Sequence, residues 1–247
     1  MISVMMPVRN NLKYLQDALS CVLNQSYQDF EFVIVDDCST EPVWDFLNSI
    51  EDSRVKIMRN EEWMGIPFTL NKILDVIKGD YICRQDADDF SDSHRFELEV
   101  GVLKSGADFV TSRYNRIDCD GNVLPDDNWI ATANKVDSKF VKANIKSVNT
   151  IVGGAPMWNR KVFEKIGYFD PLMRIASDYN YWMRVLKFFD LQIVEKRLYS
   201  HRVHGGSHRA KTNEYIRRRN GAIVDFGLLA RQRALSYETI RKEDINV

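Results

Sequence analysis

The sequence predicts an α/β fold in which helices flank a mainly parallel central sheet. The first observation is that short apolar runs, typical of strands, alternate with segments of helical periodicity over residues 1–115. The second is that two of those runs end in acidic residues, at the position where open α/β sheets bind ligands. The third is the composition, because 247 residues with 45% hydrophobic and 28% charged side chains suit one large globular domain.

Strands and helices alternate throughout the first half. A short apolar run bounded by turn residues indicates a strand, and apolar residues recurring every three or four positions indicate a helix. We expect Pro7 to end the first strand, Asn10 or Asn11 to cap the first helix, and Gly79 to stop the third helix. The predicted strands cover 2–8, 30–37, 55–58, 81–85 and 108–114, and the predicted helices cover 12–23, 43–50, 66–77 and 95–103.

The pattern becomes more irregular after residue 114. An Asp-Gly pair between short alternating runs predicts a hairpin around residues 117–124. Further helices are predicted over 137–146, 160–166 and 178–188. Because no linker or repeat separates the halves, we expect one domain over 1–210, with halves 1–115 and 116–210, followed by a basic helical tail over 211–247.

Bulk properties exclude several classes of protein. The formal net charge of −1 indicates no particular partner, and the longest apolar runs fall well short of the ~20 residues that a membrane span needs. The N-terminus has no basic leader followed by an apolar core, so no secretion signal is expected. Cys21, Cys38, Cys83 and Cys119 are widely scattered, which predicts free thiols in a cytoplasmic protein.

The C-terminal segment is strongly basic. Between Lys196 and Lys242 there are twelve Lys and Arg residues against three acids. Residues 215–233 have the pattern of a basic amphipathic helix, which favours peripheral contact with an anionic inner membrane face or a glycolipid. Nucleic acid is disfavoured because the arginines lack interleaved aromatic residues. A solvated helix that pairs with acids elsewhere remains the alternative.

Three aspartates follow the predicted strand 81–85 within four positions. Asp86, Asp88 and Asp89 would repel one another without a positive partner, and carboxylate oxygens are the ligands that Mg²⁺ or Mn²⁺ prefer. A calcium loop fits less well, because Phe90 and Ser91 stand where that loop needs a ligand and a glycine. A solvated acidic turn that caps the next helix is the structural alternative.

A second acidic pair, Asp36 and Asp37, ends the predicted strand 30–37. Because the carboxyl ends of parallel strands lie at one edge of a sheet, the two acidic groups are expected to share one pocket. One pair could bind the metal, and the other could accept hydrogen bonds from a ribose or a base. For Asp37 the alternative is an Asx-type turn with Ser39 and Thr40.

Six segments, in this order, resemble glycosyltransferase family 2, whose members have the GT-A fold and use nucleotide-diphosphate sugars. They are "ISVMMPVRNNLKYLQDALSCVLNQSYQDFEFVIVDDCST", "RNEEWMGIPFTLNKIL", "GDYICRQDADD", "GGAPMW", "GYFDPLMRIASDYNYWMRV" and "HRVHGGSH". Together they cover most of residues 1–208. The resemblance implies that 1–115 binds the nucleotide sugar and that 116–210 is the acceptor half.

The resemblance also implies roles for the aspartates. Asp36 would contact the nucleoside with support from Asp37, and Asp86 would lie near the ribose and the metal. Asp88 would be the main ligand of Mn²⁺ or Mg²⁺, and Asp89 would support the site or contact the sugar. The positive partner of the acidic cluster would then be a divalent metal carrying a UDP- or GDP-type sugar donor.

Further residues acquire roles in the same way. Gly153 and Gly154 would approach the donor sugar, since glycines let backbone N–H groups come close to a ligand, and a plain turn is their alternative. His204 would bind the metal or approach the diphosphate, whereas His201 and His208 are expected to be ordinary surface or packing residues. Pro7 and Arg84 would also lie at the donor, and the alternative for Arg84 is a salt bridge to the nearby acids.

Asp178 would be the general base, in a motif where the family usually has Glu-Asp. Here Ser177 stands in place of the glutamate. A helix N-cap formed by Ser177 or Asp178 is the structural alternative.

The predicted activity is metal-dependent, inverting transfer of one sugar to an acceptor hydroxyl, in surface polysaccharide or glycoconjugate synthesis. Inversion is implied by the resemblance alone. The sequence lacks a dinucleotide-binding glycine motif, a P-loop and the Gln-x-x-Arg-Trp motif of processive synthases. A metal-dependent nucleotidyltransferase and an inactive nucleotide-sugar-binding module remain alternatives.

Overall fold

The computed structural model describes residues 1–205, 230, 232–235 and 239–245. The predicted amphipathic helix of the basic tail therefore lies almost entirely outside the described residues, and so does His208. In the part that is described, no helix is both long enough and apolar enough to cross a membrane.

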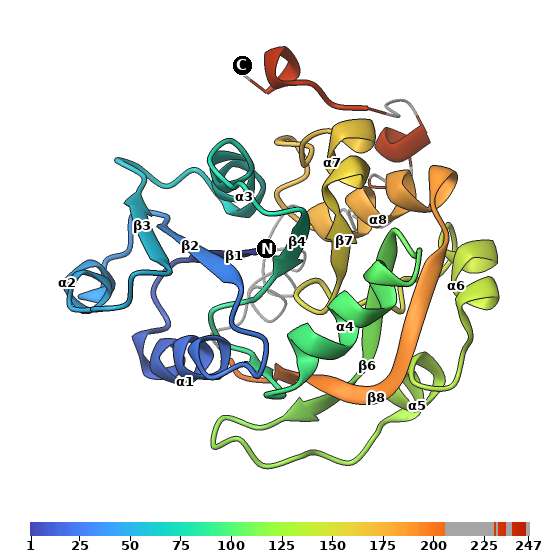
Figure 1. Ribbon diagram of the computed structural model, residues 1–247, viewed down its shortest axis with the longest axis horizontal. Coiled ribbons are helices and arrows are strands. Elements are labelled where there is room, and N and C mark those ends of the chain that lie inside the picture. The colour runs from blue at the N-terminus through green and yellow to red at the C-terminus, as the bar shows by residue number, and fades with distance from the viewer. Residues whose placement is uncertain (206–229, 231, 236–238, 246–247) are drawn as a thin grey trace, which may run out of the picture.

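One curved sheet organises the described residues, as Figure 1 shows, with the strand order β3-β2-β1-β4-β7-β6-β8-β5. Its strands are β1 (Ile2–Val8), β2 (Phe30–Asp36), β3 (Val55–Arg59), β4 (Tyr81–Arg84), β5 (Phe90–Ser91), β6 (Phe109–Ile117), β7 (Met157–Asn159) and β8 (Leu191–Arg202). The first four strands run parallel, and β6 and β8 are parallel to each other. β7 is antiparallel to both of its neighbours and joins these two groups.

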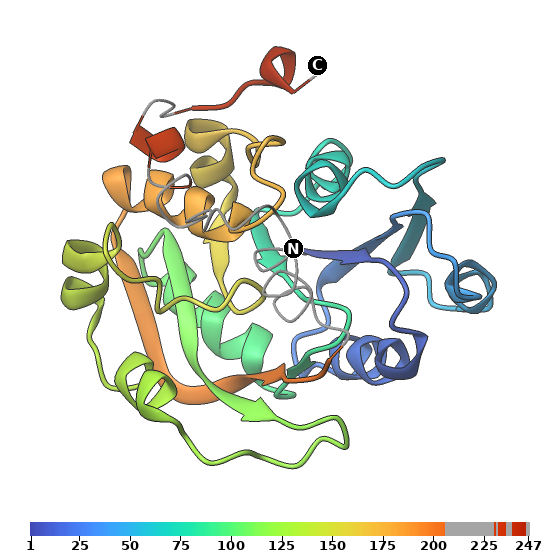
Figure 2. The same cartoon turned by 180° about the vertical axis from the view of Figure 1, so that it is seen from behind.

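Helices cover both faces of this sheet (Figures 1 and 2). They are α1 (Leu12–Leu23), α2 (Val43–Asn48), α3 (Ile66–Leu74), α4 (Arg95–Lys104), α5 (Asn128–Ala133), α6 (Ser138–Asn144), α7 (Arg160–Ile166) and α8 (Ser177–Phe188). The core on one face packs α3, α7 and α8 against the strands, and the core on the other packs α1, α2 and α4. The predicted α/β fold with flanking helices is confirmed.

The two cores explain why the first strands read as continuous apolar runs. In β1, Val4 and Met6 face the core with α1, while Met5 between them faces the core with α3. In β2, Ile34 and Val35 divide in the same way. Side chains alternate between the faces of a strand, so a strand that is covered on both faces must be apolar at every position.

Several local predictions were wrong. Asn11 precedes α1 but makes no side-chain cap, because the carboxylate of Glu41 accepts the N–H of Leu12 instead. Asn10 instead binds the loop that follows β2, where its side-chain oxygen accepts the N–H of Thr40 at 2.8 Å. β1 continues through Pro7 to Val8.

Glycine and turn positions also differed from expectation. α3 ends at Leu74, before Gly79. Gly79 is needed for another reason, since a Cβ there would lie 2.6 Å from the backbone nitrogen of Ser3. The predicted hairpin, by contrast, is present in short form: Ile117 and Val123 form an antiparallel bridge, and the carbonyl of Arg116 accepts the N–H of Leu124 at 2.9 Å. The elements that the sequence did not predict are α5, β5, β7 and β8.

The last of these strands, β8, is bound by the buried carboxylate of Asp89, the residue that directly precedes β5. This carboxylate accepts the hydroxyl of Tyr199 at 2.7 Å and the N–H of Arg202 at 2.8 Å, and Nδ1 of His201 lies 3.3 Å away. Burial opposes a charge on His201, but the carboxylate of Asp89 outweighs this effect and raises the pKa of His201 to about 9.

We expect Phe109→Ala to lower the free energy of unfolding by about 3–5 kcal/mol, because it leaves a cavity in the core. The ring of Phe109 is fully buried and stacks on Trp182 with 5.2 Å between centroids. Phe140→Ala is the matched control, since Phe140 is 42% exposed and its loss should change stability by no more than about 0.5 kcal/mol. Urea unfolding measures both, and equal losses would contradict the assignment of Phe109 to the core.

We expect the stability of the metal-free protein to fall between about pH 6.5 and about pH 9 through His201. Its folded-state pKa lies above the ordinary value of 6.5, so its contribution is complete below that pH and is lost as the pH rises through about 9. His201→Asn should flatten this part of the profile, whereas His94→Asn, at an exposed histidine, should not. Urea midpoints across this pH range give the answer, and an unchanged slope in His201→Asn would contradict the pairing with Asp89.

Candidate active site

Acidic side chains gather at the carboxyl ends of β2 and β4, the two strands on either side of β1. Asp36 is the last residue of β2, and Asp86 follows β4 by two positions. Both strands run parallel to β1, so their carboxyl ends lie at one edge of the sheet. The structure therefore brings the two predicted acidic groups to the same edge.

Asp36 and Asp37 hold two loops at this edge. Asp37 accepts the backbone N–H groups of Met64 at 2.9 Å and Gly65 at 2.8 Å, and so fixes the entry to α3. Oδ1 of Asp36 accepts the N–H of Ser39, so the turn considered for Asp37 is made by Asp36. Oδ2 of Asp36 lies 3.2 Å from Nε of Arg59 and has no hydrogen bond among the described residues.

Arg84 and Asp86 form a largely enclosed ion pair. Nε of Arg84 donates to Oδ1 of Asp86 at 2.8 Å, so the predicted salt bridge is present. Burial raises the pKa of Asp86 above its ordinary value even though Arg84 opposes the shift. Nη1 of Arg84 is buried and has no hydrogen-bond acceptor among the described residues, so one donor remains for a ligand.

The glycine loop lies directly against these groups. A Cβ on Gly153 would lie 2.7 Å from Oδ2 of Asp178 and 3.3 Å from Nη1 of Arg84. A Cβ on Gly154 would lie 2.0 Å from the hydroxyl of Tyr199. Both positions must be glycine because any side chain would displace these groups. The loop is therefore packed into the site and is more than a plain turn.

Asp178 lies at the start of α8, facing this loop. The N-cap of α8 is Ala176, and Oδ1 of Asp178 accepts the N–H of the next residue, Tyr179, at 2.8 Å. The simple N-cap considered for Ser177 or Asp178 is therefore not what the structure has. Burial opposes the charge on Arg84, but the carboxylates of Asp86 and Asp178 outweigh it and raise the pKa of Arg84.

Asp88 and His204 meet beside the ion pair. Oδ2 of Asp88 and Nε2 of His204 are 2.9 Å apart, and the ring of His204 packs on Tyr14 with 4.7 Å between centroids. Two adjacent ligands of an octahedral Mg²⁺, each about 2.1 Å from the ion, would also be about 3 Å apart. A carboxylate oxygen and an imidazole nitrogen at this spacing, which is also that of a direct hydrogen bond, are compatible with Mn²⁺, whereas Mg²⁺ prefers oxygen ligands. Within the described residues no group of three His, Cys, Asp or Glu side chains is arranged to hold a metal.

Asp89 and Pro7 occupy the margins of the site. The carboxylate of Asp89 is used by β8, as described above, so its contacts are those of a supporting residue. Pro7 is half-buried near the carboxyl end of β1, where it pairs with Val35. His201 is more than an ordinary packing residue because it contacts Asp89.

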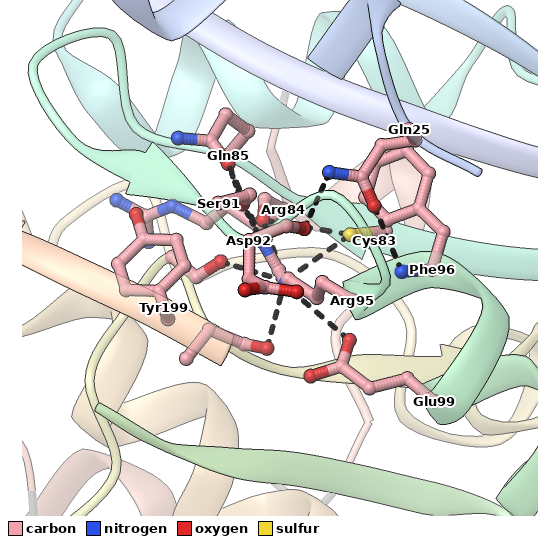
Figure 3. A network of polar contacts seen from close by, with 12 residues as sticks. Gln25, Cys83, Arg84, Gln85, Ser91, Asp92, Arg95, Phe96, Glu99 and Tyr199 are labelled. Carbon is pink, nitrogen blue, oxygen red and sulfur yellow. Dashed lines mark hydrogen bonds and ion pairs between the residues drawn. The ribbon is translucent and has the colours of Figure 1, made fainter. Parts of the chain in front are cut away.

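Arg95 is the residue that sequence reasoning missed, and Figure 3 shows it at the centre of a polar network. Its buried guanidinium donates to the carbonyl of Gly154 at 3.0 Å, to the carbonyl of Arg84 at 3.2 Å and to Glu99 at 3.2 Å. It also lies 5.0 Å from the centre of the Tyr199 ring. The available signal was the Arg-Glu pair at four-residue spacing on the apolar face of α4.

Comparison with known proteins shows which sequences and folds this chain resembles. The family model for glycosyl transferase family 2 matches residues 3–167. TuaG of Bacillus subtilis, a putative teichuronic acid biosynthesis glycosyltransferase, is 29% identical over 76% of this chain and 72% of its own length. WfaP of Escherichia coli, named as a glucosyltransferase from UDP-Glc to GlcNAc-diphosphoundecaprenol, is 28% identical over 42% of each chain.

Solved structures share the fold. S. aureus TarS residues 1–349, in complex with UDP-GlcNAc, superimposes with a TM-score of 0.69 at 18% identity, covering 84% of this chain. The chain spans 60% of that TarS fragment. The family model covers well over half of the sequence, and the acidic strand ends, the glycine loop and the start of α8 converge as described above. The chain belongs to glycosyl transferase family 2.

Proposed function

We propose that this enzyme transfers one sugar from a nucleotide-diphosphate donor to an acceptor hydroxyl, with inversion and with a divalent metal. The observation that carries the proposal is the convergence on the Gly153–Gly154 loop of Asp86 and Arg84 from the β4 side and of Asp178 from α8. Carboxylates, a free guanidinium donor and a close-packed glycine loop are the groups that a sugar diphosphate requires.

The donor diphosphate is assigned to the Arg84 side of the loop. Asp88 and His204 would hold Mn²⁺ or Mg²⁺, with Asp86 beside them. When bound, the metal would neutralise charge on the diphosphate leaving group. Nη1 of Arg84 has a buried N–H to donate to a phosphate oxygen. Asp36 and Asp37 shape the pocket for the nucleoside by fixing the loops after β2 and before α3.

Asp178 is assigned the proton transfer. Its Oδ1 is held by the N–H of Tyr179, and its Oδ2 faces the loop that would approach the donor sugar. A carboxylate there can take the proton from an acceptor hydroxyl as that oxygen attacks the anomeric carbon. The glycosidic bond forms as the bond to the diphosphate breaks, so the single displacement inverts the configuration.

The relatives support a choice of substrates. TarS binds UDP-GlcNAc, and WfaP is named for transfer from UDP-Glc to a lipid diphosphate. We therefore favour a UDP-type donor over a GDP-type donor, and an acceptor glycan or glycolipid of a surface polysaccharide or glycoconjugate. Contact of the basic tail with an anionic membrane belongs to the same proposal. A panel of nucleotide sugars with Mn²⁺ tests the activity itself.

We expect Asp88→Ala to abolish metal-dependent binding of UDP, because one of the two assigned protein ligands is lost. Calorimetry with UDP, in Mn²⁺ and in EDTA, measures the effect. Asp45→Ala is the matched control, since Asp45 is exposed on α2, which packs beside the edge strand β3. Unchanged affinity in Asp88→Ala would remove Asp88 from the metal site.

We expect Asp178→Asn to reduce kcat by about 10²–10⁴-fold with little change in donor affinity, because an amide of similar shape cannot accept the proton. Asp190→Asn, at an exposed aspartate paired with Lys142, is the control. Sugar transfer is followed with the donor that the panel identifies, and UDP affinity is measured by calorimetry. Near-normal turnover in Asp178→Asn would contradict the assignment of Asp178 as the base and leave it only a structural role.

A further inference from the structure

An exposed tryptophan with two arginines lies outside the groups assigned so far. The indole of Trp63 is 54% exposed, although an aromatic ring of this size is usually well buried. The guanidinium carbon of Arg9 lies over this ring at 4.5 Å from its centroid, and that of Arg174 lies at 5.5 Å. These residues are referred to below as the Arg9–Trp63–Arg174 cluster.

The cluster belongs to the same edge of the sheet as the active site. Arg9 directly follows β1. Trp63 lies two residues before Gly65, whose N–H is held by Asp37. Arg174 lies in the loop that leads into α8, four residues before Asp178, so their Cα atoms are at most roughly 14 Å apart. The cluster therefore joins the loop that Asp37 fixes, through Trp63, to the loop that leads to Asp178, through Arg174.

Among the described residues, the two positive charges of the cluster have no acidic partner. Neither Arg9 nor Arg174 forms an ion pair there, and Glu61 and Glu62, the acids next to Trp63 in sequence, pair with neither. Both guanidinium carbons lie within 5.5 Å of one ring centroid, so two exposed like charges lie at the same indole ring. An anion that contacts both guanidinium groups would offset the repulsion between them.

We propose that the Arg9–Trp63–Arg174 cluster binds a phosphate ester group of the acceptor. Guanidinium groups pair with phosphate oxygens through two parallel hydrogen bonds, and stacking on an aromatic ring holds the guanidinium plane in a fixed orientation. The donor diphosphate is assigned to Arg84, Asp88 and His204, which belong to β4, β8 and their adjoining loops. Arg9 and Trp63 adjoin the proposed nucleoside pocket, and Arg174 lies on the loop before α8, so the cluster would be an anion site separate from the one for the donor diphosphate. This inference rests on the proposed transferase function.

The surroundings of Arg174 favour a lipid phosphate over a soluble sugar phosphate. Leu172, two residues earlier on the same loop, is 66% exposed, and Trp63 adds further exposed apolar surface. Leucine, tryptophan and arginine together suit a group that joins an apolar chain to a phosphate. The same loop would then place the acceptor sugar toward Asp178 and its lipid chain away from it.

Binding of two matched monophosphates tests the inference. Geranyl phosphate carries an isoprenoid chain and N-acetylglucosamine 1-phosphate carries a sugar, so calorimetry with each one separates the two sources of phosphate. UDP and Mn²⁺ are present at saturation to block the donor site. We expect Arg9→Gln and Arg174→Gln each to weaken binding of geranyl phosphate by roughly 10-fold or more, because each removes a charge-assisted hydrogen bond.

Controls separate a local effect from general loss of charge or fold. Arg241→Gln removes a positive charge from an exposed arginine outside the cluster and should leave geranyl phosphate affinity unchanged. Leu172→Ser should weaken binding of geranyl phosphate more than binding of the sugar phosphate. UDP affinity in the presence of Mn²⁺, measured separately in every variant, shows whether the donor pocket is intact.

The outcomes are distinct. A wild-type protein that binds UDP but neither monophosphate overturns the inference and leaves the proposed function in place. Loss of UDP affinity in Arg9→Gln or Arg174→Gln, with unchanged monophosphate binding, also overturns it and assigns the cluster to the donor. Equal losses for both monophosphates with no effect of Leu172→Ser support the phosphate site and reject the lipid. A wild-type protein that binds no UDP contradicts the proposed function itself.

Discussion

The buried guanidinium of Arg95 is the interaction on which the site depends. It comes from α4, yet it binds the carbonyls of the glycine loop and of the end of β4, and it packs on the ring of Tyr199. Removing a charge from water is costly, and here Glu99 and several carbonyls offset that cost. Burial in turn raises the pKa of Glu99, although Arg95 opposes the shift. One side chain therefore sets the distance between the elements that would hold the donor.

Around Arg95, several carboxylates at the edge of the sheet lie next to a basic side chain. Arg84 pairs with Asp86, His201 lies against Asp89, and Nε2 of His204 contacts Asp88. Asp178 keeps one oxygen directed at the glycine loop. The arrangement separates carboxylates that hold structure, such as Asp37 and Asp89, from those with an oxygen left for a ligand. Arg84 and His201 therefore offset part of the negative charge before any ligand arrives, and the remaining groups define where one would bind.

The sequence predicted the elements whose signals are local. α1 and α7 were predicted with the observed bounds from their local patterns. The bounds of β1, a continuous apolar run, were also predicted correctly, although Pro7 does not end it. β8 was missed because its middle is exposed and rich in charge, so only its pairing with β6, far away in the chain, makes it a strand. The acids that follow β2 and β4 were predicted because they end strands, whereas Asp178, at the start of α8, was predicted from the family resemblance. Arg95 was not, because its role depends on carbonyls that approach only in three dimensions.

The position of β7 has a consequence for how this chain comes to be folded during synthesis. β4 pairs with β1 early, but its other edge pairs with β7, which begins more than seventy residues later. Until that segment has left the ribosome, β4 presents unpaired backbone groups that another chain could join. The glycine loop immediately before β7 and Asp178 on α8 also arrive late. The nascent protein therefore acquires its protected sheet and its complete pocket in the same final stage.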